Sequence, residues 1–146
     1  MLGLALSLLL LLPSVCQAVL GEPESSVAQD RKFSATKTYR KRTQNVVSVH
    51  ELVSDALTIR EFAANGIIFA VAWNGMSHPD VSQLFGKQFE IFRQQNERVR
   101  KLPGRGPGKV DAGNLVVEYS GHMRSVRGRA YLLNQIPPGF SLEDIQ

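Results

Sequence analysis

The sequence predicts an α+β fold, with an antiparallel sheet of about five or six strands packed against one long amphipathic helix. Two observations carry this prediction. Around Asn65-Gly66, two apolar runs flank a dipeptide that accepts the positive φ angles of a type I′ hairpin turn. Over residues 81–92, apolar residues recur at the 3–4 residue spacing of a helix with one buried face.

The first 18 residues have the pattern of a secretory signal peptide, with cleavage predicted after Ala18. Residues 2–12 are almost all Leu and Ala, and Pro13 breaks the run. As a helix this run would span about 16 Å, against a hydrocarbon core of about 30 Å, so a retained anchor is the less favoured alternative. The run has no Lys or Arg before it, which departs from the usual signal pattern. We expect no transmembrane span after cleavage.

This pattern predicts an exported protein, periplasmic or secreted. Cys16 is the only cysteine, and Val15 stands before it where a lipoprotein signal would have a small residue, so lipidation is a second alternative. Cleavage after Ala18 leaves a chain without thiols, hence without disulfides. The predicted organisation is a signal peptide (1–18), a flexible polar leader (19–30) and a single α+β domain (31–146).

The domain is expected to begin with an edge strand, because Phe33, Ala35 and Tyr39 alternate with polar residues in a stretch rich in Lys and Arg. A β-branched strand follows over residues 46–53. The hairpin at Asn65-Gly66 then joins a strand of period two (57–62) to a strand that is apolar on both sides (67–73) and therefore central.

The helix is predicted to begin with a capping box, in which Ser77 is the N-cap and Asp80 the N3 residue, and to end before Pro103. Residues 102–114 are interpreted as a basic Gly/Pro connector without a phosphate-binding pattern. A strand over 115–119, a turn at Ser120-Gly121 and a final strand over 123–133 complete the sheet. Residues 141–144 are expected to form one helical turn.

The charge balance is basic, with 17 Lys and Arg against 13 Asp and Glu, a net charge of +4 and a pI near 9.5. A basic surface favours anionic neighbours in general. We therefore expect an anionic envelope component, such as a phospholipid head group or a polyanionic glycan, or a protein partner. Nucleic acid is not an expected partner.

Four stretches together suggest a relationship to known proteins: Ala18-Val19-Leu20-Gly21; residues 66–75 followed by His78-Pro79-Asp80; Gly121-His122-Met123-Arg124; and Gly128-Arg129-Ala130-Tyr131. On these residues the chain resembles a family of small exported proteobacterial proteins catalogued as a domain of unknown function. Met76-Ser77 departs from the family pattern, in which Pro is more typical after Gly75. The resemblance implies an envelope or secreted location, and it brings no catalytic residues.

No catalytic or metal-binding pattern stands out. The three histidines, His50, His78 and His122, lack the spacing of metal ligands, so neither a metal nor a cofactor is expected. Gly-x-Ser-x-Gly is absent, and the mature chain has no Cys nucleophile. Glu61 and Glu118 are interpreted as solvent-facing strand residues.

An anion site is the most specific hypothesis. On an extended strand Arg127, Arg129 and Tyr131 share one face, whereas His122 and Arg124 lie on the other. Two guanidinium groups about 7 Å apart could bind a phosphate or carboxylate through forked hydrogen bonds. Gly128 would allow close approach. The alternative is a wet sheet face on which these arginines pair with acidic residues of neighbouring strands.

The function that these observations favour is that of a non-enzymatic exported accessory protein that binds an anionic envelope component or a protein partner. The first alternative is a small hydrolase or isomerase using His122 with a carboxylate, either Glu61 or Glu118. The second is a purely protein-binding role, in which the edge strand near residues 33–39 receives a partner strand.

Overall fold

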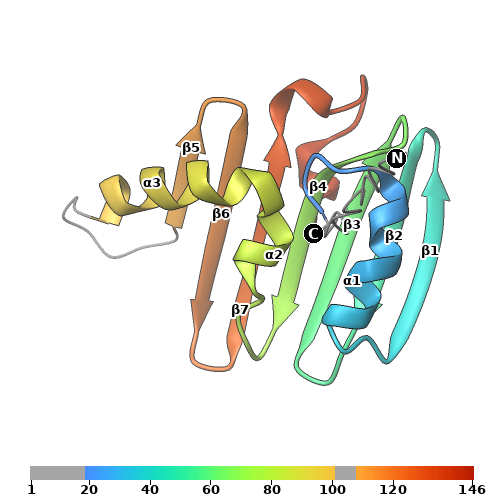
Figure 1. The fold of residues 1–146 in the computed structure, drawn as a ribbon, viewed down its shortest axis with the longest axis horizontal. Coiled ribbons are helices and arrows are strands. Elements are labelled where there is room, and N and C mark those ends of the chain that lie inside the picture. Colours follow the sequence, from blue (N-terminus) through green and yellow to red (C-terminus); the bar gives the residue numbers. More distant parts are fainter. Residues whose placement is uncertain (1–18, 101–107) are drawn as a thin grey trace, which may run out of the picture.

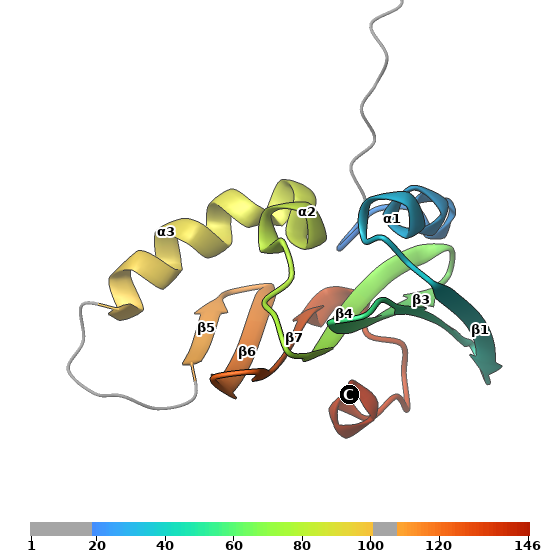
Figure 2. The same ribbon diagram turned by 90° about the horizontal axis from the view of Figure 1, so that it is seen from below.

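The computed structural model describes residues 19–100 and 108–146. The predicted signal peptide, its cleavage site after Ala18 and residues 102–107 of the predicted Gly/Pro connector lie outside these residues. The described chain forms a seven-stranded antiparallel sheet in the order β1-β2-β3-β4-β7-β6-β5, with helices on one face (Figures 1 and 2). Its strands are β1 (Thr38–Gln44), β2 (Val47–Val53), β3 (Leu57–Ala64), β4 (Ile67–Gly75), β5 (Gly108–Ala112), β6 (Leu115–His122) and β7 (Ser125–Leu132).

Two meanders build the sheet. Strands β1 to β4 pair in chain order, as do β5 to β7, and the two meanders join where β4 pairs with β7. The predicted α+β class is confirmed, but the number of strands is higher than predicted. The additional strand is β5, which falls at the end of the segment interpreted as a connector. In β5 only Val110 is fully buried, so its apolar signal is too weak to indicate a strand.

The β3–β4 hairpin turns as predicted, with positive φ at both Asn65 (53°) and Gly66 (76°). The last hairpin differs from the prediction. β6 continues through Ser120-Gly121 to His122, and Arg124 takes the positive φ of 63° in the turn that follows. β7 therefore begins at Ser125 rather than at Met123.

The segment predicted as a flexible leader is folded. Val19 and Leu20 are buried. Two backbone hydrogen bonds join the next residues to the start of β4: Gly21 N donates to Ile68 O at 2.8 Å, and Ile68 N donates to Glu22 O at 3.0 Å. A 3₁₀ turn (Glu24–Ser26) then leads into α1 (Val27–Phe33). Few apolar residues anchor this segment, so its composition resembles that of a loose leader.

The predicted edge strand is correct only from its last residue. Phe33 ends α1, Ala35 lies in a turn with φ of 48°, and Tyr39 is the second residue of β1. β1 is an edge of the sheet, and most of its side chains are exposed. The alternation of residues 33–39 therefore reflects a helix end and a turn rather than a strand.

Where one long helix was predicted, the structure has three consecutive helical segments over residues 81–100. They are α2 (Val81–Phe85), a 3₁₀ turn (Gly86–Gln88) and α3 (Phe89–Arg100). The break lies at Gly86, whose φ of 46° favours glycine. The N-cap is Asp80 and not Ser77, because the Asp80 carboxylate accepts hydrogen bonds from the backbone N–H groups of Ser82 and Gln83 at 3.0 and 3.3 Å. No helix of the described residues is long and apolar enough to cross a bilayer.

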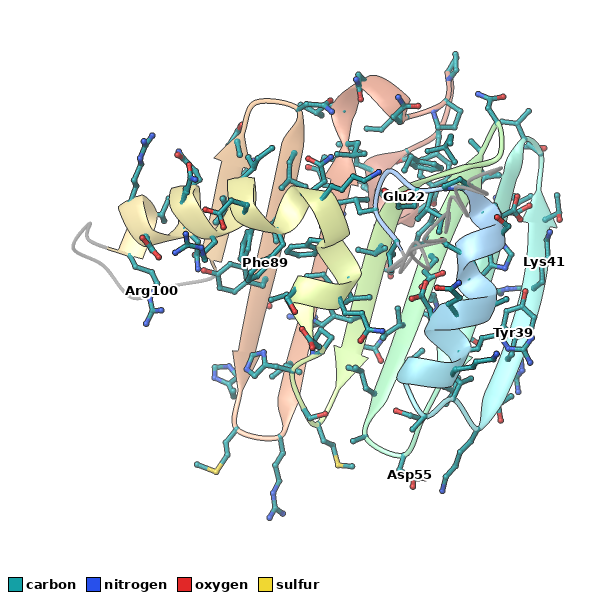
Figure 3. The ribbon with its side chains drawn as sticks, in the orientation of Figure 1. Glu22, Tyr39, Lys41, Asp55, Phe89 and Arg100 are labelled. Atoms are coloured by element: carbon teal, nitrogen blue, oxygen red, sulfur yellow. The ribbon has the colours of Figure 1, made fainter. Side chains whose placement is uncertain are left out.

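Both faces of the sheet carry apolar side chains. On the helix side, Phe85 packs between Trp73 and Phe92, with ring centroids 6.1 and 5.0 Å away, and Phe89 contacts the same cluster (Figure 3). On the opposite face, the C-terminal residues 136–146 cover Phe62 and Phe69 through Phe140 and the buried Ile145. Figure 2 shows this segment on the side of the sheet away from the helices. The sheet therefore has a helix side and a C-terminal side.

Candidate functional site

An open groove of about 900 Å³ lies on the C-terminal side of the sheet, over β7, β6 and β5 and beside the last residues of the chain. We call it the arginine groove. Its polar lining includes Asn74, Lys109, Glu118, Ser120, Arg127 and Arg129 from the strands, with Glu143 and Gln146 from the C-terminal segment. The groove lies on this side because Glu118 and Arg129 alternate with Val117 and Ala130, which pack on the helix side.

Arg129 is held on three sides. Its Nε and Nη2 donate to Glu118 Oε2 at 2.6 Å, and its Nη1 donates to the backbone oxygen of Leu142 at 2.6 Å. Glu118 and Arg129 are direct partners in the β6–β7 register, which places the two charges opposite each other. The cross-strand pairing that the sequence left as an alternative is therefore confirmed for Arg129.

Two arginines fix the C-terminal segment to the sheet. Arg129 holds Leu142, and Arg60 on β3 donates through Nη1 to the backbone oxygen of Gln146 at 2.7 Å while its Nε contacts Glu51 at 2.7 Å. Both contacts use a guanidinium to satisfy a carbonyl and a carboxylate at once, which its fork of five donors permits. Arg129 therefore has a structural role that does not depend on a ligand.

Arg127 has a different environment. The Arg127 side chain is exposed. Its Nε donates to Oγ of Ser120 at 3.2 Å, and Ser120 is the residue opposite Arg127 in the β6–β7 register. Lys109, across the groove, is 60% exposed and stands 3.6 Å from Glu118. Contacts of this length between exposed groups contribute about 0–1 kcal/mol, so both cations can turn to another anion at little cost.

The other predicted anion ligands do not line the groove. Tyr131 is 4% exposed and packs in the apolar cluster under the C-terminal segment, where burial raises the pKa of its phenol. His122 is exposed at the end of β6, and Arg124 is exposed in the turn beyond it. The structure therefore brings Arg127 and Arg129 together and leaves the other three residues outside.

Neither Glu118 nor Glu61 lies close to His122. Glu118 is four residues away on the same strand, which corresponds to about 13 Å. Glu61 is buried on the helix side of β3. General acid–base catalysis needs hydrogen-bond reach, so the geometry gives the enzymatic alternative no support.

Gly128 is approached by protein rather than by a ligand. A Cβ at this position would stand 2.2 Å from Cζ2 of Trp73, because the indole ring lies over the glycine on the helix side of the sheet. Gly108 is covered in the same way by the ring of Tyr119. These glycines allow aromatic side chains to lie flat on the sheet.

A second polar cluster lies on the helix side, beneath α1. Glu61 is wholly buried, and Asp30 on α1 is 4% exposed. None of their four carboxyl oxygens meets a protein N–H or O–H donor in the described structure, and the two groups contact each other. Burial raises the pKa of Asp30 to about 7, and burial together with the Asp30 charge raises that of Glu61 well above its usual range.

A hydrogen-bonded chain adjoins this pair. His50, the register partner of Glu61, contacts Tyr39 Oη through Nδ1 at 2.8 Å and Glu24 Oε1 through Nε2 at 2.7 Å. Lys41 also donates to Glu24 at 2.9 Å, and its hydrogen bond lowers the pKa of that carboxyl. Figure 3 shows Tyr39 and Lys41 on β1 beside α1. This chain ties the segment before α1 to the sheet.

Sequence reasoning missed the carboxyl pair because it interpreted Glu61 as facing solvent. One signal was present: Glu61 occupies the apolar side of an alternation with Ile59 and Ala63. Nothing local indicated Asp30 as its partner, since that residue lies in the stretch interpreted as a leader. Among the described residues, no group of three or more His, Cys, Asp or Glu side chains is placed to hold a metal ion.

The fold and its surfaces define a small single-sheet α+β protein with an open polar groove on one side and a buried acidic cluster on the other. The chain belongs to the family described as Protein of unknown function (DUF2844), whose model matches residues 16–145. No curated protein and no solved structure matches the chain.

Proposed function

We propose that this protein is an exported, non-enzymatic accessory protein that binds an anionic ligand in the arginine groove. The observation that carries the proposal is the exposed guanidinium of Arg127 beside an open groove of about 900 Å³. A groove of this size falls within the range of small-molecule sites. The ligand is an anionic component of the cell envelope, either a lipid head group or an acidic glycan.

The charges in the groove suggest separate roles for its cations. Arg129 is already neutralised by Glu118 at 2.6 Å, so it has little attraction left for a ligand. Arg127 can form a forked pair with a phosphate or carboxylate, while Lys109 contributes a mobile point charge. Arg129 and Glu118 act as positioning residues, because they hold β6, β7 and the C-terminal segment around the groove.

The signal pattern of residues 1–18 supports export to the periplasm or the exterior of a Gram-negative cell. Cell fractionation followed by N-terminal sequencing tests this part of the proposal. We expect a periplasmic or secreted chain that begins at Val19. Full-length protein in the cytosol, with Met1 retained, would contradict it.

Binding is tested with vesicles containing phosphatidylglycerol, with the acidic polysaccharide polygalacturonate, and with neutral phosphatidylcholine vesicles as the background. The double variant Arg127→Ala/Lys109→Ala should lose at least tenfold in affinity for the anionic probe that binds the parent. The matched control is Arg42→Ala/Lys32→Ala, which removes the same charge from exposed positions on β1 and α1.

Equal losses in the two double variants would mean that net charge, and not the groove, binds the anion. Absence of binding to both anionic probes would also contradict the proposal. The lipid and glycan arms separate the two sources of the anionic group. The dependence on salt should be steep in either case, because screening weakens contacts between exposed charges.

A further inference from the structure

A pocket of about 220 Å³ opens beside the buried carboxyl pair, between α1, β3 and the segment that precedes α2. Its lining includes Asp30 and Glu61, the hydroxyl-bearing residues Ser34, Ser54 and Ser77, and His78. Asp80 also reaches it. Among the described residues that line the pocket, none is Lys or Arg. The pocket is therefore acidic and rich in hydrogen-bond acceptors.

The carboxyl oxygens in this pocket have more acceptor capacity than the protein fills. Glu61 has no exposed surface, and both of its oxygens, like both of Asp30, lack a donor from the described residues. A single proton shared by the pair supplies one O–H···O bond and leaves two oxygens without a donor. Buried acceptors in native proteins are nearly always satisfied.

We propose that this pocket is a binding site for an organic cation with N–H donors, either an alkylammonium or a guanidinium group. An ammonium offers three donors and a guanidinium five, which suits two lining carboxyl groups whose oxygens meet no donor within the described part of the chain. A metal ion fits less well, because metal sites in proteins generally use three or more protein ligands, and no such group is present among the described residues.

The size of the pocket restricts the ligand. At about 220 Å³ it is smaller than the sites that hold drug-sized molecules. It accommodates the charged head and a short carbon chain, as found in a free amine or in the end of a Lys or Arg side chain. Leu52, Leu57 and Ile59 line the same pocket and would contact the carbon chain.

Binding is coupled to proton release. The cation enters with its N–H groups. The O–H bond of the carboxyl group that holds the shared proton breaks, the proton passes to water or buffer, and the carboxylate left behind accepts hydrogen bonds from the cation. Affinity should therefore rise with pH by up to about tenfold per unit across neutral pH. Other titratable groups face the pair: His50 from β2, with Glu24 and Tyr39 beyond it, and His78 and Asp80 at the mouth of the pocket.

Calorimetric titration of the folded protein with n-butylammonium at pH 6 and pH 8 tests the proposal. We expect millimolar or tighter binding that is stronger at pH 8, with protons released in proportion to the ionisation enthalpy of the buffer. N-acetyl-lysine amide is the second probe, and it separates a side-chain ligand from a free amine. Tetramethylammonium, a cation without N–H groups, should bind at least tenfold more weakly.

The decisive variant is Glu61→Gln, which keeps the size of the side chain and removes the charge. It should lose at least tenfold in affinity, and Asp30→Asn provides a second variant with the same expectation. Glu118→Gln, the same change on the other side of the sheet, should bind n-butylammonium like the parent. His78→Gln should leave the direction of the pH dependence unchanged.

Three results would overturn the proposal. They are absence of binding of both N–H probes to the parent at pH 8, equal binding of tetramethylammonium, and equal binding by folded Glu61→Gln or Asp30→Asn. The anionic probes of the arginine groove are independent of this titration. A failure here therefore leaves the proposed function standing.

Discussion

The two sides of the sheet handle charge in opposite ways. On the C-terminal side, Glu118 and Arg129 are opposite charges that the β6–β7 register places directly across from each other, and each side chain is more than a quarter exposed. On the helix side, Glu61 and Asp30 are two acidic groups buried against each other, and burial raises the pKa of both. The first arrangement is a modest structural contact. The second opposes stability at neutral pH, which is typical of a functional site.

The largest effect on stability should come from a substitution of Gly128, the β7 residue over which the Trp73 ring lies. Gly128→Ala places a Cβ where the Trp73 ring lies, and such overpacking should lower the free energy of unfolding by about 3 kcal/mol. Urea denaturation measures the loss. In a double-mutant cycle, the smaller ring of Trp73→Phe should recover part of it. Strictly additive losses would show that the indole does not determine the need for glycine.

The next effect has the opposite sign. Glu61→Gln should raise the free energy of unfolding by about 2 kcal/mol at pH 8, because a neutral amide is less costly to bury beside Asp30 than an ionisable carboxyl group and can donate a hydrogen bond to it. Both acids have raised pKa values in the folded state, so the folded parent holds more protons than the unfolded chain between about pH 4 and pH 7. The stability of the parent therefore falls as the pH rises through this window, and the variant should flatten the curve.

The same substitution on the other side should destabilise the protein slightly. Glu118→Gln weakens the ion pair with Arg129 and should cost about 0.5–1 kcal/mol, less in high salt. Chemical denaturation at low and high salt measures this effect. A stabilising Glu118→Gln would remove the contrast between the two sides of the sheet.

The smallest effect on stability is expected for the groove cations. Arg127→Ala/Lys109→Ala removes two exposed side chains and should change the free energy of unfolding by less than about 0.5 kcal/mol. Thermal melting is the check. A large loss would mean that these residues support the fold, and the binding experiment would then need single variants.

Parts of the fold were predictable because their signals are local. The Asn65-Gly66 turn has the positive φ values that the dipeptide favours, and the apolar run before Asn74 is buried as expected for a central strand. The capping of α2 was misassigned by three residues, since both Ser77 and Asp80 are good N-caps and only the tertiary fold selects between them.

The remainder depends on contacts between distant residues. Residues 19–33 appear polar in the sequence because Val19, Leu20 and Val27 are their few apolar anchors, and these residues bury against strands much later in the chain. The pairing of Arg129 with Glu118 was one of two possibilities that only the register could decide. The burial of Glu61 with Asp30 has no sequence signal beyond one charged residue on an apolar strand face.

The carboxyl pair is the feature on which the contrast between the two sides depends, and a ¹³C NMR titration of the Asp and Glu side chains measures it directly. The account predicts that Asp30 titrates near pH 7 and that Glu61 keeps its proton well above pH 4.5. Ionisation of both groups near pH 4, as in an unfolded chain, would contradict it.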